Sequence, residues 1–248
     1  MKKLAYSLSG ILIVFIAWTI LYLAVSNNYV VPSPLKSVKE ALLLFGKGYF
    51  YSALFSSLLR VLISFLISII TAVITAVISY RYKTFASIFG SVIAVMRSLP
   101  TLAIMLIILV AINRSTAPII VCILTLIPLL YTAIFTALSG VKKDLIEMCK
   151  VYKVPCKKQV FSLYIPSILP TLCFDFSSAL SFSLKLVISA EILADVYKSF
   201  GGLMVEASIY SETVMLFALA IAICVIGIII EFIGKFAFDK MEKKGYGN

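Results

Sequence analysis

Five charged residues lie inside long apolar stretches, and their side chains are the best placed to do chemistry: Arg60, Arg97, Asp175, Lys185 and Glu191. A charge at the centre of a membrane-spanning helix costs at least ~2.5–3.5 kcal/mol, so such residues pair with one another or line a polar passage. Two interpretations therefore stay open, compensating ion pairs that pack helices together and a charged lining that contacts an ionic solute.

We name four of these residues as candidates for the lining of a passage: Arg60, Arg97, Lys185 and Glu191. Arg60 or Lys185 facing such a passage would suit an anionic solute, because opposite charges attract strongly away from bulk water. Asp175 and Arg97 lie near the predicted cytoplasmic ends of their stretches, where a charged head can also reach the membrane surface.

Several kinds of chemistry are excluded by what the sequence lacks. Histidine is absent, which excludes histidine-bound metals, Ser-His-Asp triads and histidine proton relays. The phosphate-binding pattern G-x-x-x-x-G-K-[ST] is absent too, so the chain does not itself hold ATP and we expect no cofactor in it. We therefore expect no enzyme, and any energy must come from another chain or from an ion gradient.

The composition indicates which elements position these residues. Of the 248 residues, 62% are hydrophobic and 13% charged, with a mean hydropathy of +1.11. Soluble domains are about 45–50% apolar and about 25% charged, so the composition excludes a soluble or disordered chain. The fold class that it predicts is an all-α polytopic membrane protein.

Six apolar runs are long enough to span a bilayer, which takes roughly 20 residues. They cover residues 6–25, 52–80, 85–112, 117–138, 167–193 and 213–233. Between the first two runs, Val38, Ala41, Leu42 and Phe45 recur at helical spacing and predict a short amphipathic helix at the outer membrane surface.

The positive charges predict the orientation of the chain. With the N-terminus inside, the cytoplasmic segments hold fourteen lysines and arginines and the outer segments five. Lysine and arginine collect on the cytoplasmic side, so both termini are predicted to be cytoplasmic. The same bias explains the formal charge of +11, and we expect a lipid bilayer rather than nucleic acid as the partner.

The longest polar stretch, residues 140–159, is predicted to face the cytoplasm between the fourth and fifth runs. Leu145, Met148, Cys149 and Tyr152 recur at helical spacing, so an amphipathic helix is expected, with Pro155 at its end. From periodicity alone this helix either rests on lipid headgroups or docks on another protein.

This stretch resembles the EAA loop of the ABC importer permeases of bacteria, in which E-A-A is followed by three residues, a glycine and a later hydrophobic-proline pair. Here Glu147-Met148-Cys149 stands at E-A-A, Lys153 at the glycine and Ile165-Pro166 at the closing pair. Both alanines and the glycine are replaced. Pro155 is expected to supply the helix break that the glycine normally gives.

Four further stretches are similar to motifs of the nitrate/sulfonate/taurine-type permeases and occur in the same order. They read VPSPLKSV at 31–38, SSLLRV at 56–61, RSLPTLA at 97–103 and KLVISAE at 185–191, the last followed by Gly202-Leu203. The resemblance extends over nearly the whole chain and implies six transmembrane helices in the type I ABC importer permease fold.

The resemblance also implies domains, site residues and partners. Residues 1–50 would hold the first helix and the outer amphipathic segment, 51–236 the permease domain with a coupling loop at 140–166, and 237–248 a cytoplasmic tail. The residues implied to couple to an ATPase are Asp144, Leu145, Glu147, Met148, Cys149, Tyr152, Lys153 and Pro166.

The implied partners are two ABC ATPase subunits that bind the ATP, a second permease copy forming a homodimer, and an extracytoplasmic substrate-binding protein. The implied location is the bacterial inner membrane. The solute would be small, such as a sulfonate, nitrate or a vitamin precursor. The alternative from a different class is an ion-coupled secondary transporter, which would need no docking helix and would gather ionisable residues at the midplane.

Overall fold

The computed structural model describes residues 2–25, 27 and 29–245. Within these residues the chain is helical and contains no strand. The elements are α1 (Lys2–Val25), α2 (Pro34–Leu44), α3 (Gly48–Arg81), α4 (Lys83–Ser98), α5 (Thr101–Ala111), α6 (Ala117–Ser139), α7 (Lys143–Val151), α8 (Cys156–Gln159), a π-helical turn η1 (Val160–Tyr164), α9 (Ile165–Ala194), α10 (Phe200–Ile209) and α11 (Thr213–Gly245).

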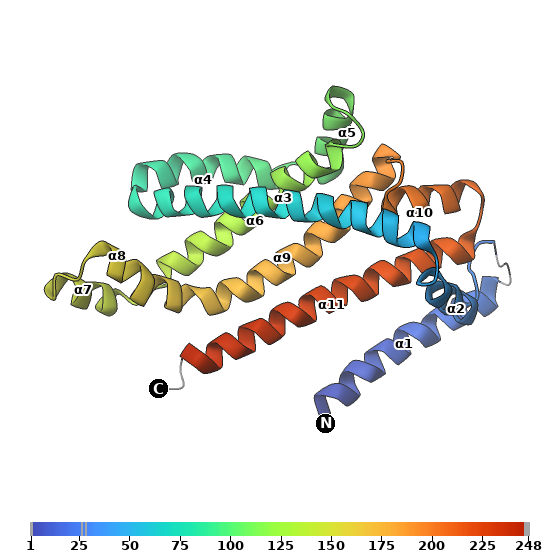
Figure 1. Ribbon diagram of the computed structural model, residues 1–248, viewed down its shortest axis with the longest axis horizontal. Helices are drawn as coiled ribbons and strands as arrows, with labels where there is room; N and C mark the ends of the chain where they lie inside the picture. Colours follow the sequence, from blue (N-terminus) through green and yellow to red (C-terminus); the bar gives the residue numbers. More distant parts are fainter. Residues whose placement is uncertain (1, 26, 28, 246–248) are drawn as a thin grey trace.

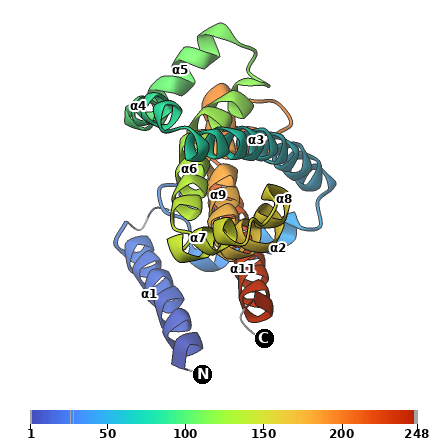
Figure 2. The same cartoon turned by 90° about the vertical axis from the view of Figure 1, so that its left-hand side faces the viewer.

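The centre of the fold is made by α3, α6, α9 and α11, which pack side by side (Figure 1). By length and hydropathy, four segments of the described chain can cross a membrane: Gly48–Arg81, Ala117–Ser139, Cys156–Ala194 and Thr213–Ile233. These coincide with four of the six predicted spans. Figure 2 shows much of α1 diverging from the central helices, while the ring of Trp18 on α1 stacks on that of Phe217 on α11 at 5.3 Å between centroids.

The run at 85–112 was expected to form one span, and the structure divides it into α4 and α5, which meet at an angle of 91°. The cause is Pro100, which forces Leu99 into an extended conformation with ψ 128° and cannot donate a backbone hydrogen bond itself. Counting this bent pair as one span gives five, so the sixth predicted span, at 6–25, stays a prediction.

Close packing of α3 on α6 follows from a row of small side chains on α3. Ser57, Ser64, Ser68, Ala72 and Ala76 are all buried and recur at intervals of seven or four residues, that is two turns or one, along one face. Small residues let two helix backbones approach closely in a membrane, where packing rather than water exclusion holds helices together. Ser64 and Ser68 donate their hydroxyl protons to carbonyls one turn back, so no polar group is left unpaired there.

The predicted amphipathic helix is present as α2. On its predicted apolar face Val38, Leu42 and Phe45 are exposed, so the protein leaves most of this face uncovered, and Ala41 is buried. Ser37 and Leu44 are buried as well, and α2 packs against α11.

Candidate functional site

A cluster of buried polar groups joins α3, α9 and α10. The Glu191 carboxylate on α9 is fully buried, and the hydroxyl of Ser57 on α3 lies 2.7 Å from one of its oxygens. Nη1 of Arg60, one turn further along α3, donates to the same carboxylate at 3.0 Å and forms an ion pair with it. A buried charge needs such a partner, and here the partner comes from another helix.

The same cluster caps the first turn of α10. The first amide groups of a helix have no partner inside the helix and must find acceptors elsewhere. Three side-chain oxygens accept them here: Phe200 N donates to Ser57 Oγ at 2.9 Å, Gly201 N to Glu191 Oε2 at 3.0 Å and Gly202 N to Ser199 Oγ at 2.9 Å. The cluster therefore fixes the start of α10 against α3 and α9.

Gly201 is required by this close approach. A Cβ atom at this position would lie 2.4 Å from Cβ of Glu191 and 2.9 Å from the carbonyl oxygen of Ile188. Both obstacles belong to α9, and one of them is backbone. Only glycine allows α10 to begin at this distance from α9.

Two of the four predicted passage residues, Arg60 and Glu191, are thus brought together in one ion pair. Their pairing supports the interpretation in which compensating charges pack helices. Sequence reasoning missed Ser57 and Gly201 as members of the cluster. The signal was present, because Ser57 belongs to the quoted SSLLRV stretch and Gly201 directly precedes the quoted Gly202-Leu203 pair.

The predicted helix in the polar stretch is present as α7. Figure 1 shows α7 and α8 at one end of the molecule, beyond the ends of the central helices. The first turn of α7 contains Asp144 and its last turn contains Lys150. A negative charge at the start of a helix and a positive charge at its end both interact favourably with the helix dipole. Pro166, from the closing pair of the motif, is exposed in the first turn of α9.

The end of α7 differs from the expectation. Pro155 does not end the helix; α7 stops at Val151, and Lys153 takes a left-handed conformation with φ 49°. The amide of Val154 donates to the carbonyl of Cys149 at 2.9 Å, which is the closing bond of a Schellman motif. The break therefore falls at the residue that stands at the glycine of the EAA pattern, although that residue is lysine.

The exposed face of α7 is shifted by one position from the predicted apolar face. Cys149 is 7% exposed and Leu145 is partly buried, so these two point toward the chain itself. Met148 is 49% exposed, and Val151 and Tyr152 are each 77% exposed. Asp144 and Glu147 are exposed as well, and Val151 is the member that sequence reasoning missed.

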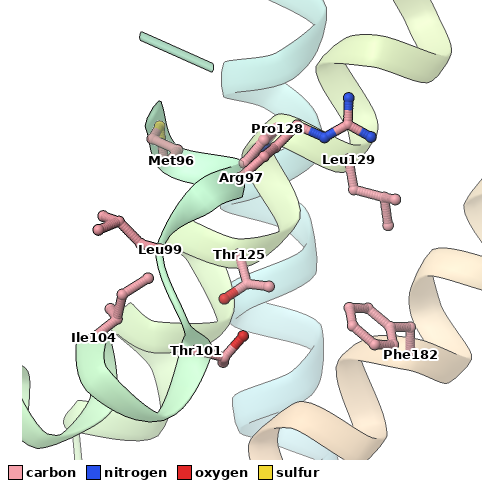
Figure 3. Close-up of a pocket in the computed structure, with 9 residues that line it drawn as sticks. All are labelled: Met96, Arg97, Leu99, Thr101, Ile104, Thr125, Pro128, Leu129 and Phe182. Carbon is pink, nitrogen blue, oxygen red and sulfur yellow. The ribbon is translucent and has the colours of Figure 1, made fainter. Parts of the chain in front are cut away.

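Arg97 lies at the break between α4 and α5, in the wall of a recess of about 180 Å³. The break also contributes Thr101, and α6 and α9 contribute Thr125 and Phe182. Figure 3 shows the hydroxyls of Thr101 and Thr125 turned toward each other across the opening, with Phe182 on the opposite side. Arg97 is exposed, and its Nη1 lies 3.5 Å from the hydroxyl of Thr132.

A second recess of about 330 Å³ adjoins the first, because Leu129 and Phe182 line both. Its further walls include Asp175 and Ser178 of α9. In the described part of the chain, Asp175 has no ion-pair partner. The first recess thus has Arg97 in its lining and the second has Asp175, and neither residue has an ion-pair partner among the described residues.

One face of α9 carries polar residues that the protomer leaves uncovered. The face follows helical spacing and comprises Thr171, Asp175, Ser178, Phe182, Lys185 and Ser189; all are exposed except Asp175, which is partly buried. Exposed polar side chains in a membrane-spanning helix face a water-filled passage or a neighbouring protein rather than lipid. Lys185, the fourth predicted passage residue, lies on this face, apart from the Arg60–Glu191 pair.

Comparison with known proteins agrees with this architecture. The family described as "Binding-protein-dependent transport system inner membrane component" matches residues 64–243. No curated protein sequence matches the chain.

Two solved structures share the fold, and both are inward-facing conformations of the MetNI methionine ABC transporter. The CY5 native crystal form has a TM-score of 0.63 at 16% sequence identity, covering 76% of this chain and 94% of that chain. The selenomethionine-soaked form of the same crystal has a TM-score of 0.63 at 16% identity, covering 78% and 96%. At this identity the likeness shows the fold alone.

The family match covers residues 64–243, which is most of the chain, and the MetNI structures share its overall fold. The chain is not an enzyme but a multi-pass inner-membrane protein, and it belongs to the family of binding-protein-dependent transport system inner membrane components, the permease subunits of ABC importers.

Proposed function

We propose that this permease moves a small solute, delivered by an extracytoplasmic binding protein, as a homodimer powered by two ATPase subunits that dock on α7. The observation that carries the proposal is the exposed face of α7. It offers Glu147, Met148 and Val151 at one end of the molecule with no covering element from the described chain.

The exposed face has the chemistry of a docking surface rather than of a solvated loop. Met148, Val151 and Tyr152 provide an apolar centre, and Glu147 and Asp144 add charge at its rim. Protein interfaces typically combine an apolar core with a polar rim. The lysines around the helix, Lys142, Lys143 and Lys150, would steer association with an acidic partner surface.

The position of α7 also suits mechanical coupling. After Lys153 the chain passes through α8 and η1 directly into α9, without a loop between these three elements. A force applied to α7 therefore reaches α9, which carries both the polar face and Glu191. Nucleotide-driven closure of the docked ATPases would move α9 and switch the passage between inward-open and outward-open states.

The uncovered polar face of α9 supports the homodimer. A second copy that placed its own α9 opposite would enclose a passage lined by two such faces. Arg97 and Lys185 supply positive charge along this face and its adjoining recess, which supports a solute with an anionic group. A sulfonate fits these charges. The proposal therefore includes that this permease is of the nitrate/sulfonate type.

The arrangement of the termini supports the predicted orientation. In Figure 1 the C-terminal end of α11 lies toward the end of the molecule that holds α7, and α1 runs from the region of α2 to its N-terminus in the same general direction. If α7 meets an ATPase in the cytoplasm, both termini are cytoplasmic. The domain limits at residues 51 and 236 belong to the same proposal.

Co-purification tests this function. The tagged full chain, expressed in its own host and extracted in mild detergent, should bring down an ABC ATPase in a one-to-one ratio. The matched control is the same preparation of a variant in which α7 carries Met148→Asp and Val151→Asp, which should lose the ATPase and keep the elution volume of the folded permease. Solute uptake driven by an ion gradient in vesicles without ATP would contradict the proposal.

A further inference from the structure

The two adjoining recesses carry opposite charges at their two ends. The first has Arg97 in its wall, the second has Asp175, and Leu129 and Phe182 are shared by both. From this geometry we infer that the joined recess is a solute-contact site in the passage, and that it takes a zwitterion whose anionic group lies by Arg97 and whose cationic group lies by Asp175. The inference rests on the proposed transport function.

The charges at the two ends are available to a solute. The described chain contains two ion pairs, Lys47–Glu40 and Arg60–Glu191, and neither involves Arg97 or Asp175. Arg97 reaches one side-chain hydroxyl at 3.5 Å, so most of its donors have no partner among the described residues. Arg60 is neutralised by Glu191 and offers no free charge.

The middle of the site suits the body of a small organic molecule. Leu129 and Phe182 line both recesses, and Figure 3 shows these two apolar side chains on the same side of the first recess. The volumes, about 180 and 330 Å³, exceed the share of a single water molecule many times over. A purely inorganic anion would leave the Asp175 end unmatched, and an uncharged solute would leave both ends unmatched.

The site lies where a passing solute must meet it. Asp175, Ser178 and Phe182 belong to the polar face of α9 that the protomer leaves uncovered. The break between α4 and α5 opens the opposite wall, because it turns the chain through 91° directly after Arg97. Broken helices beside a substrate passage are common in transporters.

Charged thiol reagents test the inference without knowledge of the solute. Thr125→Cys probes the Arg97 recess and Ser178→Cys the Asp175 recess, each in the full chain with its five cysteines replaced by alanine or serine. The probes are an anionic sulfonatoethyl and a cationic trimethylammonioethyl methanethiosulfonate, and each rate is divided by the rate with free cysteine. The anion-to-cation ratio should exceed one at Thr125→Cys and fall below one at Ser178→Cys.

Removing each charge should change the anion-to-cation labelling ratio at the cysteine in the same recess. Arg97→Gln should lower the ratio at Thr125→Cys by about tenfold, because a unit charge roughly 6 Å away in a water-like medium acts oppositely on the two probes. Asp175→Asn should raise the ratio at Ser178→Cys by a similar factor. Arg97→Lys and Asp175→Glu should keep the ratios, and Arg114→Gln, in the exposed turn after α5, should leave both unchanged.

Three results would overturn the inference. One is the same charge preference at both positions, which would indicate a site for an anion or a cation alone. Another is a preference that Arg97→Gln and Asp175→Asn do not move. The third is failure of both reagents to reach either cysteine, which would mean that the recess holds no water. Labelling needs no ATPase. A chain that co-purifies with an ATPase but shows no charge preference in labelling would therefore refute the zwitterion site and leave the proposed transport function standing.

Discussion

Nη1 of Arg60 lies 3.0 Å from Oε1 of Glu191, and this ion pair ties α3 to α9 across 131 residues of sequence. The Glu191 side chain is fully buried, and that of Arg60 is 12% exposed. The pair also fixes α10, since Glu191 accepts the amide of Gly201. Coupling through α9 requires that α3 and α10 follow its movement, and this cluster makes the three helices one unit.

Removing the carboxylate should destabilise this unit. Glu191→Ala leaves Arg60 and the amide of Gly201 without their acceptor, and breaking a buried ion pair from one side costs about 3–5 kcal/mol. We expect a clear fall in the thermal unfolding temperature of the detergent-solubilised chain. Glu206→Ala, an exposed residue of α10, should leave that temperature unchanged; equal effects of the two variants would contradict the assignment.

Gly201→Ala should have a comparable effect for a steric reason. The added Cβ would lie 2.4 Å from Cβ of Glu191, so α10 must move away from α9 and its capping bonds lengthen. Gly90→Ala is the matched control, because nothing lies within 4 Å of a Cβ there. Alanine in a helix interior is favoured over glycine by about 0.5–1 kcal/mol, so the control should be stable or slightly stabilised. The yield of folded protein in size-exclusion chromatography distinguishes the two.

Whether the sequence predicts a feature of this structure depends on whether local interactions or contacts between distant residues determine that feature. The spans at 52–80, 117–138, 167–193 and 213–233 follow from length and hydropathy, which are local, and the structure has helices there. The bend inside the run at 85–112 has a local cause too, because Pro100 keeps Leu99 in an extended conformation.

The candidate site was harder to predict because partners come from distant helices. That Arg60 pairs with Glu191, while Arg97 and Lys185 do not, depends on which faces of α3 and α9 meet. A list of charged residues in apolar runs holds no such information. On α7 the exposed face differs by one position from the predicted apolar face, because Val151 and Leu145 are both apolar and packing decides which of them is exposed.

Replacing Lys153 by glycine should stabilise the end of α7. Lys153 has φ 49°, a left-handed conformation that costs a residue with a Cβ about 1–2 kcal/mol and glycine very little. Part of this gain in stability is lost because glycine has more conformational freedom in the unfolded chain. Hydrogen exchange at the amides of residues 152–154 should become slower in Lys153→Gly. Lys150→Gly, inside the helix, should make exchange faster, and the same direction in both would be inconsistent with the left-handed cap.

Reversing the charge of Glu147 should uncouple the permease from its ATPase. Glu147→Arg places a cation at the rim of the proposed docking face, and like charges across an interface cost several kcal/mol. We expect at least a tenfold loss of co-purified ATPase, with an unchanged unfolding temperature because Glu147 is exposed. Glu206→Arg, on α10 at the opposite end of the molecule, should not reduce the co-purified ATPase. Normal ATP turnover and solute uptake by Glu147→Arg would refute the role of this residue.

The central claim is that α7 docks on the ATPase through its exposed face, and site-specific photo-cross-linking in intact membranes measures this contact directly. A photoreactive amino acid placed at Val151 should cross-link to the ATPase subunit, and one placed at Cys149, which faces the chain itself, should not. Cross-links from Val151 to lipid alone, or equally from both positions, would contradict the account.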